Sequence, residues 1–310
     1  MPTKDSVFFG PAAAFADQDL IEKKQGALLP SDDTLNEHCY LLYIPQGICA
    51  EEIQTYAIGA AYSRLLIVLE EGASAQARVW LGRGEGDPDS VHTTEIFLAD
   101  EAELSLLFVQ ESDAPVLTIR QRSSVEANAK LHMQNVSLGT GKLDHNFLSD
   151  VQGVHGESSI DWLFYSKNKE QQHINVRNMF HAKDGGGEIV MKGVAEDEAH
   201  TICTGMIDIG LGGSGTDTYL TEDVLMLDKT AKVDAVPGLE IKTNDVKASH
   251  SATVSKVTKD DLFYFAARGI PENAAREMYV LGFLGDLTQR IANGQERTEV
   301  LEAIERKYQR

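Results

Sequence analysis

The sequence predicts a mainly β protein that ends in a small helical region. From residue 91 to about residue 254 one pattern recurs, in which short apolar strands alternate with glycine-rich or acidic turns. Amphipathic helical patterns are confined to residues 258–310, and none interrupts the strands, which argues against an alternating α/β sheet. A sandwich, a barrel or a coiled β-solenoid therefore remains.

The spacing of three histidines favours the solenoid. His145, His173 and His200 each lie just before or inside a predicted strand, 28 and then 27 residues apart. An interval of this length is typical of a solenoid whose coils stack their apolar faces on one another. Three of nine histidines can also fall at near-equal intervals by chance, so this observation alone leaves the other two architectures open.

The first part of the chain is less regular. A strand is expected within residues 35–47, where Pro45-Gln46-Gly47 ends it, and residues 63–82 give a buried strand, a turn at Glu71-Gly72 and an alternating strand. These patterns divide the chain into a short mixed segment (residues 1–60), a β core (61–257) and a helical domain (258–310).

Three helices are expected at the C-terminal end. Thr258 begins the first, with Asp261 three residues later in a capping-box arrangement, and Gly269 suits its end. Pro271 suits the first turn of the second helix, and Asn293-Gly294 its end. A third follows over residues 296–308. The apolar stripe of the second helix consists of Ala275, Met278, Leu281, Leu284, Leu287 and Ile291.

Charge and cysteine content restrict the possible partners and the compartment. The formal net charge of −20 argues against nucleic acid and anionic membranes, which attract clustered Lys and Arg, whereas a basic partner stays possible. No apolar run approaches the length of a membrane span, and the N-terminus lacks the layout of a signal peptide. The three cysteines form no C-x-x-C pair. A cytoplasmic protein with reduced thiols is therefore expected.

Motifs for several common activities are missing. Residues 139–142 resemble the end of a P-loop, but Leu143 replaces the required Ser or Thr and Val136 the first glycine, so no nucleotide site is expected. Neither a G-x-S-x-G elbow nor an H-E-x-x-H motif is present. His173 and His181 are eight residues apart and would share one strand face if the strand is unbroken; they are then either a metal pair or satisfied histidines in or beside the core.

His250 has an unusual setting, because small residues flank it on both sides in Ala248-Ser249-His250-Ser251-Ala252. A large polar side chain in such a segment suggests a shallow pocket or an interface. Imidazole there can ligate a borderline metal ion or transfer protons near neutral pH. A lone histidine is, however, more often structural.

Three segments around this histidine resemble the SufB/SufD family of iron–sulfur cluster assembly proteins. They read GMIDIGLGGSGTDTYLTEDVLML, DKTAKVDAVPGLEIKTNDVKASHSATVSKV and DDLFYFAARGIPENAAREMYVLGF. The resemblance covers roughly residues 140–290 and is strongest to compact SufB-like proteins of archaea and anaerobic bacteria.

The resemblance implies a fold, partners and a cargo. The fold would be a right-handed β-helix. A SufC-like ABC ATPase would dock on residues 258–310 and hold the ATPase activity, while this chain would be a non-catalytic scaffold. A homodimer, or a heterodimer with a second SufB/SufD-type subunit, would form through the β-helix ends. His250 would lie near that interface as a ligand of iron or of a transient iron–sulfur cluster that is built there and passed on.

The ligand set implied by the family is incomplete in this chain. Thr230 stands where bacterial SufB has a cysteine after Asp-Lys, and Cys203 is the only cysteine in the matched region, with a small buried apolar role as its simpler explanation. Carboxylates are then expected to complete a labile site with His250; the candidates are Asp228, Asp234, Glu240 and Asp245. The alternatives are a structural SufD-like partner that binds no cluster and a β-helical metalloenzyme.

Overall fold

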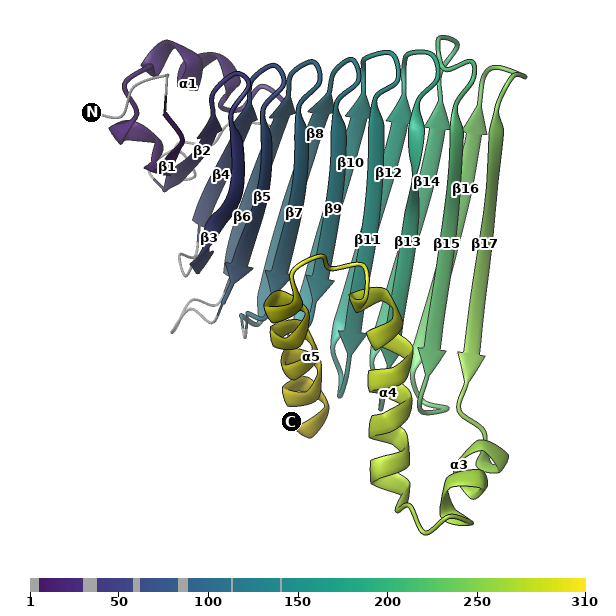
Figure 1. The fold of residues 1–310 in the computed structure, drawn as a ribbon. Coiled ribbons are helices and arrows are strands. Elements are labelled where there is room, and N and C mark those ends of the chain that lie inside the picture. Colours follow the sequence, from purple (N-terminus) through teal and green to yellow (C-terminus); the bar gives the residue numbers. More distant parts are fainter. Residues whose placement is uncertain (1–5, 30–37, 58–61, 83–88, 113, 140) are drawn as a thin grey trace.

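The chain folds as a parallel β-solenoid followed by three helices, as the computed structural model shows for residues 6–29, 38–57, 62–82, 89–112, 114–139 and 141–310 (Figure 1). The first sheet consists, in spatial order, of β1 (Phe8–Pro11), β2 (Cys39–Ile44), β4 (Tyr62–Leu69), β6 (Asp89–Leu98), β8 (Val116–Val125), β10 (Lys142–Val151), β12 (Gln171–Phe180), β14 (His200–Ile209) and β16 (Lys232–Ile241). The second consists of β17 (Lys247–Lys256), β15 (Asp217–Met226), β13 (Gly186–Ala195), β11 (Glu157–Ser166), β9 (Lys130–Ser137), β7 (Glu103–Gln110), β5 (Ser74–Leu81) and β3 (Cys49–Ala57). The predicted mainly β solenoid with a helical C-terminal region is confirmed.

Each coil gives one strand to each sheet, and strands of successive coils pair in parallel. Side chains alternate along the regular strands from β4 onward, so one set points between the sheets and the other outward. The inward set forms a continuous apolar core that includes the fully buried Phe108, Phe147, Trp162 and Phe180. Alternation thus explains the apolar interior and the polar outer faces of strands such as β10 and β12.

One corner of the solenoid repeats in every coil from Gly72 to Gly215. Gly72, Glu101, Asn128, His155, Asp184 and Gly215 recur at intervals of 29, 27, 27, 29 and 31 residues, each with a φ between 56° and 84°. Their amides donate to a carbonyl of the next coil, as Asn128 N does to Val154 O at 3.0 Å. Gly, Asn and Asp tolerate this left-handed conformation best, which explains much of the choice of residues.

The histidine spacing is close to the coil length but is not the repeat itself. His145 pairs with Ile174, His173 with Asp144, and His200 with Gln171, so the three histidines occupy different positions in their coils. His145 is fully buried between the sheets, whereas His173 is half exposed on the outer face. The solenoid prediction is correct, although these histidines do not stack.

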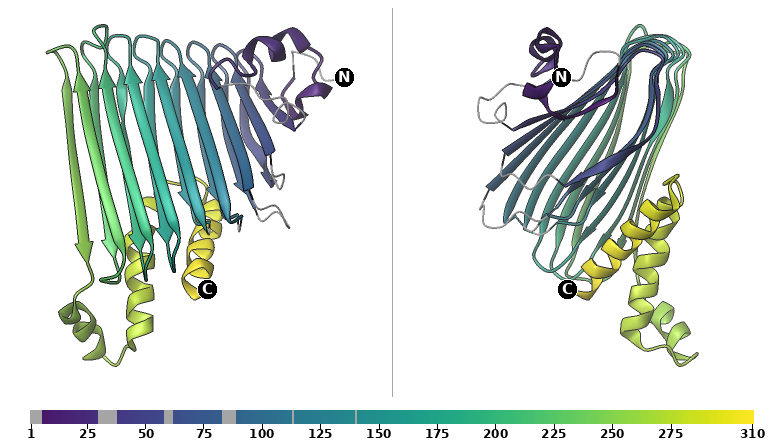
Figure 2. Two further views of the ribbon diagram at one scale, coloured as in Figure 1. Left: turned by 180° about the vertical axis from the view of Figure 1, so that it is seen from behind. Right: turned by 60° about the vertical axis from the view of Figure 1, so that its left-hand side comes forward.

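The solenoid begins inside the segment expected to be mixed. β2 and β3 pair with β4 and β5 in the same parallel arrangement as later coils, so the first coil starts at Cys39. Before it, β1, the short helix η1 (Ala12–Ala14) and α1 (Gln18–Lys24) lie beside the first strands of the first sheet (Figure 2). The Phe15 and Tyr43 rings pack together there, with their centroids 4.9 Å apart.

The three C-terminal helices are α3 (Lys259–Ala266), α4 (Glu272–Thr288) and α5 (Gly294–Gln309). The capping box of Thr258 and Asp261 is present at α3, and Gly269 has a positive φ of 76° after its end. Asn293 differs from its expected role, because it caps α5 rather than ending α4. Its side chain accepts hydrogen bonds from the amides of residues 295 and 296.

The helices do not form a separate core. α4 and α5 lie against the outer face of the second sheet, and α3 projects beyond the strand ends (Figures 1 and 2). One apolar cluster joins Leu163 and Val194 of the sheet to Leu284 of α4 and Ile304 of α5. Where α4 and α5 cover the second sheet, its outward side chains are therefore apolar as well, and these strands bury side chains on both faces.

Candidate functional site

The last coil of the solenoid is open. β16 pairs with β14 and β17 pairs with β15, and no described strand lies beyond either of them in its sheet. Both strands are therefore edge strands, with backbone groups available for pairing. Their side chains are mostly exposed or half exposed, in contrast to the coils before them.

His250 lies on the inner face of this coil. It pairs with Leu220 of β15, which is 1% exposed inside the core, and it shares its face with Ala248, which packs against that core. Parallel strands in register keep paired residues on the same face. His250 is exposed because no further coil covers it. The expectation of an exposed histidine in a segment of small residues agrees with this position.

Glu222 is buried one coil below, where sequence reasoning did not place a functional residue. It lies on the inner face of β15 with 0% exposure, and neither carboxylate oxygen has a hydrogen-bond partner of normal geometry. Burial raises the pKa of Glu222 to about 7, an effect that the nearby amides of Gly205 and Val236 partly offset. A buried carboxyl group with neither a charged partner nor a well-formed hydrogen bond is rare in folded proteins.

Gly205 of β14 makes room for this carboxyl group. A Cβ atom at residue 205 would lie 2.8 Å from Glu222 Oε1 and 2.5 Å from Leu220 Cδ1. The alternation TYLTEDVLML contained a signal for Glu222, since an acid occupies an inward position between Leu220 and Val224. Without the strand pairing, the sequence could not show whether the Glu222 side chain points inward or outward.

Cys203 faces the same interior from β14. It is fully buried, its Sγ lies 3.7 Å from the carbonyl oxygen of Asp234, and it is two residues from Gly205. Burial raises the pKa of the Cys203 thiol to about 12, and the Glu222 carboxylate adds to the rise. The thiol is therefore protonated at neutral pH. Glu222 and Asp234 are the charged residues close enough to act on this thiol.

The carboxylates expected to join His250 lie elsewhere. Asp228 follows β15 at the opposite end of the strand, roughly 20 Å along β17 from His250 at about 3.3 Å per residue. Asp245 lies in the corner before β17, at the other end of the strands from Asp228, where it accepts a hydrogen bond from Ser214 Oγ at 2.8 Å. Asp234 and Glu240 lie on the outer face of β16, paired with His200 at 2.9 Å and with Lys242 at 2.9 Å. Within one chain, these four are not brought together with His250.

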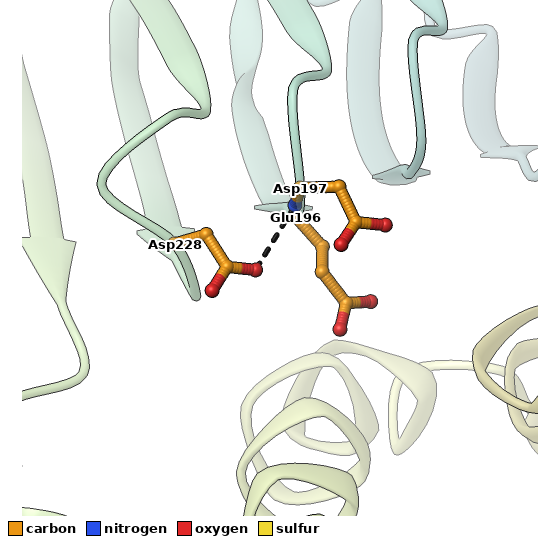
Figure 3. Close-up of side chains that lie close together, drawn as sticks. All are labelled: Glu196, Asp197 and Asp228. Carbon is orange, nitrogen blue, oxygen red and sulfur yellow. Dashed lines mark hydrogen bonds between the residues drawn. The ribbon is translucent and has the colours of Figure 1, made fainter.

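Asp228 instead belongs to an acidic cluster with Glu196 and Asp197 (Figure 3). Their carboxylate oxygens lie within 4.8 Å of one another, the one such group of three potential metal ligands among the described residues. Asp228 Oδ2 accepts from the Asp197 amide at 3.0 Å, and Thr230 Oγ1 donates to the Asp197 carbonyl.

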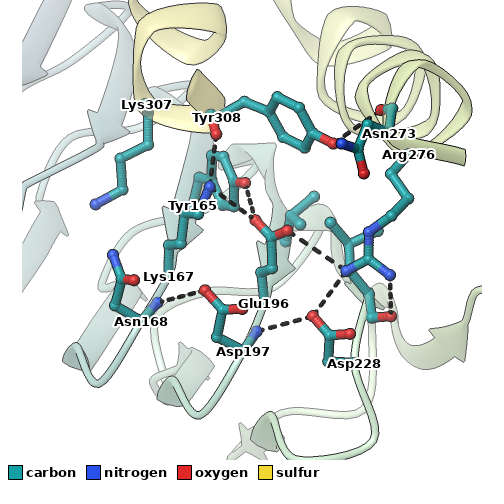
Figure 4. A network of polar contacts seen from close by, with 12 residues as sticks. Tyr165, Lys167, Asn168, Glu196, Asp197, Asp228, Asn273, Arg276, Lys307 and Tyr308 are labelled. Carbon is teal, nitrogen blue, oxygen red and sulfur yellow. Dashed lines mark hydrogen bonds and ion pairs between the residues drawn. The ribbon is translucent and has the colours of Figure 1, made fainter. Parts of the chain in front are cut away.

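Basic and phenolic groups already satisfy this cluster (Figure 4). Arg276 of α4 donates hydrogen bonds to Asp228 at 2.7 Å and to Glu196 at 3.4 Å, and the Tyr165 hydroxyl donates a hydrogen bond to Glu196. Lys167 Nζ lies 3.6 Å from Glu196 Oε2. The cluster therefore anchors α4 to the corners of two coils, and it carries no indication of a metal site.

His173 and His181 do not form a metal pair. Eight residues of extended strand separate them by roughly 26 Å. Each lies beside a different carboxylate, His173 at 3.8 Å from Asp144 and His181 at 3.2 Å from Asp150. This metal-site hypothesis was wrong, because a shared strand face does not bring distant positions together.

Comparison with known proteins gives the family. The SUF system FeS cluster assembly, SufBD core domain model matches residues 52–283. The chain is 26% identical to a SufBD family protein of Synechocystis over 87% of its own length, 27% to SufD of Escherichia coli over 85%, and 28% to a SufBD family protein of Mycobacterium bovis over 79%.

The chain spans about three fifths of these relatives, namely 61%, 62% and 63% of their lengths. No helix among the described residues is long and apolar enough to cross a membrane. Because the core-domain model covers most of the solenoid and extends into α4, the chain belongs to the SufBD family of iron–sulfur cluster assembly proteins.

Proposed function

We propose that this chain is a scaffold subunit on which a SUF-type complex builds iron–sulfur clusters and from which it passes them on. The observation that carries the proposal is the open last coil, which presents His250 at an unpaired sheet end inside the family's core domain. Imidazole is a good ligand for iron, and an exposed ligand at an interface suits a cargo that has to leave. Iron and the cluster are therefore the substrate and product of the complex, and not a resident cofactor of this chain.

A second SufBD-type subunit pairs with this end. β16 and β17 offer two free strand edges, and large apolar side chains are exposed beside them: Val236 is 50% exposed and Val254 is 44% exposed. Such edges normally pair with another strand or are protected by charge. Pairing of two copies about a two-fold axis brings two His250 side chains to one interface. A distinct family member on the same edges gives the heterodimer.

The pairing surface is tested by oligomeric state. Val236→Lys places a charge in the contact and is expected to shift the purified dimer to monomer in light scattering. Val116→Lys on the outer face of β8 is the matched control, because Val116 is 37% exposed in the middle of the solenoid. A wild-type monomer that dimerises only with a coexpressed relative assigns the heterodimer. A Val236→Lys dimer as stable as the wild type contradicts the surface.

An ABC-type ATPase partner docks on residues 258–310. α3 and α4 expose large apolar side chains, with Phe263 71%, Tyr264 55% and Met278 51% exposed. β17 ends at Lys256 and α3 begins at Lys259, so a movement of α3 is transmitted directly to the strand that carries His250. ATP hydrolysis by the partner would thereby alter the interface that holds the cluster. Aromatic anchors of this kind are typical of binding hot spots.

Anaerobic reconstitution with iron, sulfide, the ATPase and ATP tests the scaffold role. Wild-type protein is expected to develop cluster absorption and to pass the cluster to an apo-ferredoxin. His250→Ala is expected to lose both, whereas His173→Ala, which removes a half-exposed histidine from the outer face of β12, retains them. A tight ATPase complex without any cluster on the wild type would instead identify a structural partner. Equal clusters on the wild type and His250→Ala refute the assignment of His250.

A further inference from the structure

We propose that Glu222 and Cys203, together with His250, form a binding site for a divalent first-row metal ion of the iron(II) class behind the open end of the solenoid. The proposal rests on the scaffold function above for the role of His250, and it adds two ligands from inside the core. The resulting sulfur, oxygen and nitrogen donor set suits iron(II), cobalt(II) and zinc(II).

Register brings these residues to one region of the interior. Glu222 pairs with Ala252 of β17, and His250 lies two residues before Ala252 on the same face. With strands about 4.8 Å apart and about 3.3 Å per residue, the Cα atoms of Glu222 and His250 are roughly 8 Å apart. Two ligands on one metal ion commonly have such a separation, since each side chain spans several ångströms.

Cys203 approaches from the opposite sheet. It shares the inward face of β14 with Gly205, the residue against which the Glu222 carboxyl group lies. The last coil covers this region with Ala235 and Pro237 of β16 and Ala252 of β17, and Cys203 and Glu222 have 0% exposure beneath it. Entry of an ion therefore requires this edge coil to move. The three donor atoms do not all lie within 4.8 Å of one another, so binding requires these side chains to move closer together, with the exposed His250 turning inward.

The other buried carboxylates show what is unusual about Glu222. Six carboxylate side chains are buried among the described residues, and five of them have an Arg or Lys partner: Glu95 with Arg64, Asp150 with Arg122, Asp161 with Arg290, Glu170 with Lys307 and Glu196 with Arg276. Glu222 is the sixth and has no ion pair. Buried charges are normally paired or bind metals, and a cation is the missing partner here.

Charge balance supports a divalent ion. A thiolate from Cys203 and a carboxylate from Glu222 together neutralise a 2+ charge, so the loaded site is neutral in the apolar interior. Binding then displaces the proton of each ligand, and His250 adds a neutral nitrogen ligand. Neither bond formation nor proton release requires an oxidant or a reductant.

Cobalt(II) binding to the purified, tag-free chain tests the site without the ATPase. Wild-type protein under anaerobic conditions is expected to bind one cobalt(II) with tetrahedral visible absorption and thiolate-to-cobalt charge transfer. Glu222→Gln keeps the size of the side chain but removes the carboxylate ligand. Loss of a residue that merely supports a metal ligand typically weakens affinity by about 10- to 100-fold, and we expect a loss at least as large here. Cys203→Ser is expected to abolish the charge-transfer band.

Glu240→Gln is the matched control, because Glu240 is an exposed carboxylate on the outer face of β16, and it is expected to leave cobalt affinity unchanged. Circular dichroism confirms that each variant is folded. Equal cobalt affinity of Glu222→Gln and wild type, or binding without thiolate absorption, overturns the proposal. This result is independent of cluster assembly: a wild type that binds cobalt as described but never builds a cluster refutes the scaffold function alone.

Discussion

Replacing Glu222 by Gln is expected to stabilise the apo protein at alkaline pH. The folded-state pKa of Glu222 is raised from 4.5 to about 7 by burial. The folded protein therefore holds the proton more tightly than the unfolded chain does, and stability is lost as the pH rises through about 7. A shift of this size corresponds to about 3 kcal/mol at pH 8. The Glu222→Gln variant has no charge to bury at this position and escapes this loss.

The pH dependence separates this effect from a general improvement in packing. At pH 5 the folded carboxyl group is protonated, and the expected gain from Glu222→Gln falls below about 1 kcal/mol. Chemical denaturation at pH 8 and at pH 5, followed by circular dichroism, measures both values. Glu240→Gln, which changes an exposed carboxylate, is expected to change stability by less than about 0.5 kcal/mol at either pH.

The reasoning fails if Glu222→Gln is no more stable than wild type at pH 8, or if its gain is the same at both pH values. Either outcome means that Glu222 is solvated or paired in solution. Hydrogen exchange localises the effect, because amides of β15 and β17 should gain protection before those of distant coils in a solenoid whose repeats contact only their neighbours.

Three further predictions concern other parts of the molecule. His92 and His145 are fully buried and have lowered pKa values, about 3 for His92, so stability should fall as pH drops below about 6.5, by about 1.4 kcal/mol per pH unit for each; His92→Asn should remove its share of the slope in denaturation curves. Arg276→Met leaves the acidic cluster without its guanidinium and should cost about 2 kcal/mol, with early proteolysis of the C-terminal helices. Phe263→Ala should weaken ATPase binding by at least about 1 kcal/mol in calorimetry, whereas Leu211→Ala, which changes another highly exposed apolar side chain at a coil corner, should not.

Local chemistry made several elements predictable. The strands at residues 39–44 and 62–81 follow apolar runs and alternation, and the Thr258–Asp261 capping box fixed the start of α3. The coil length was also near the observed 29-residue offset between β10, β12 and β14. The left-handed corner marks this repeat in the structure, but its residues differ from coil to coil, as Glu101, Asn128 and His155 do, so the sequence does not reveal it.

The site was less predictable because it depends on register and on outward packing. The position of His250 in a segment of small residues was informative, since those residues lie on an uncovered strand. The carboxylates Asp228 and Glu240 are near in sequence but lie at another corner and on another face. Glu222 needed the pairing of β15 with β17 before its inward position had meaning. The shared core of α4, α5 and the second sheet could not be read from the helices alone.

The most direct test of the central claim is the cluster formed on the open end of the solenoid. Wild-type protein and His250→Ala are reconstituted side by side with iron, sulfide, the ATPase and ATP, and cluster absorption is followed with time. The proposed scaffold predicts a cluster on wild type and its loss on His250→Ala, with the dimer and the ATPase complex intact. Identical absorption from both proteins would contradict the claim.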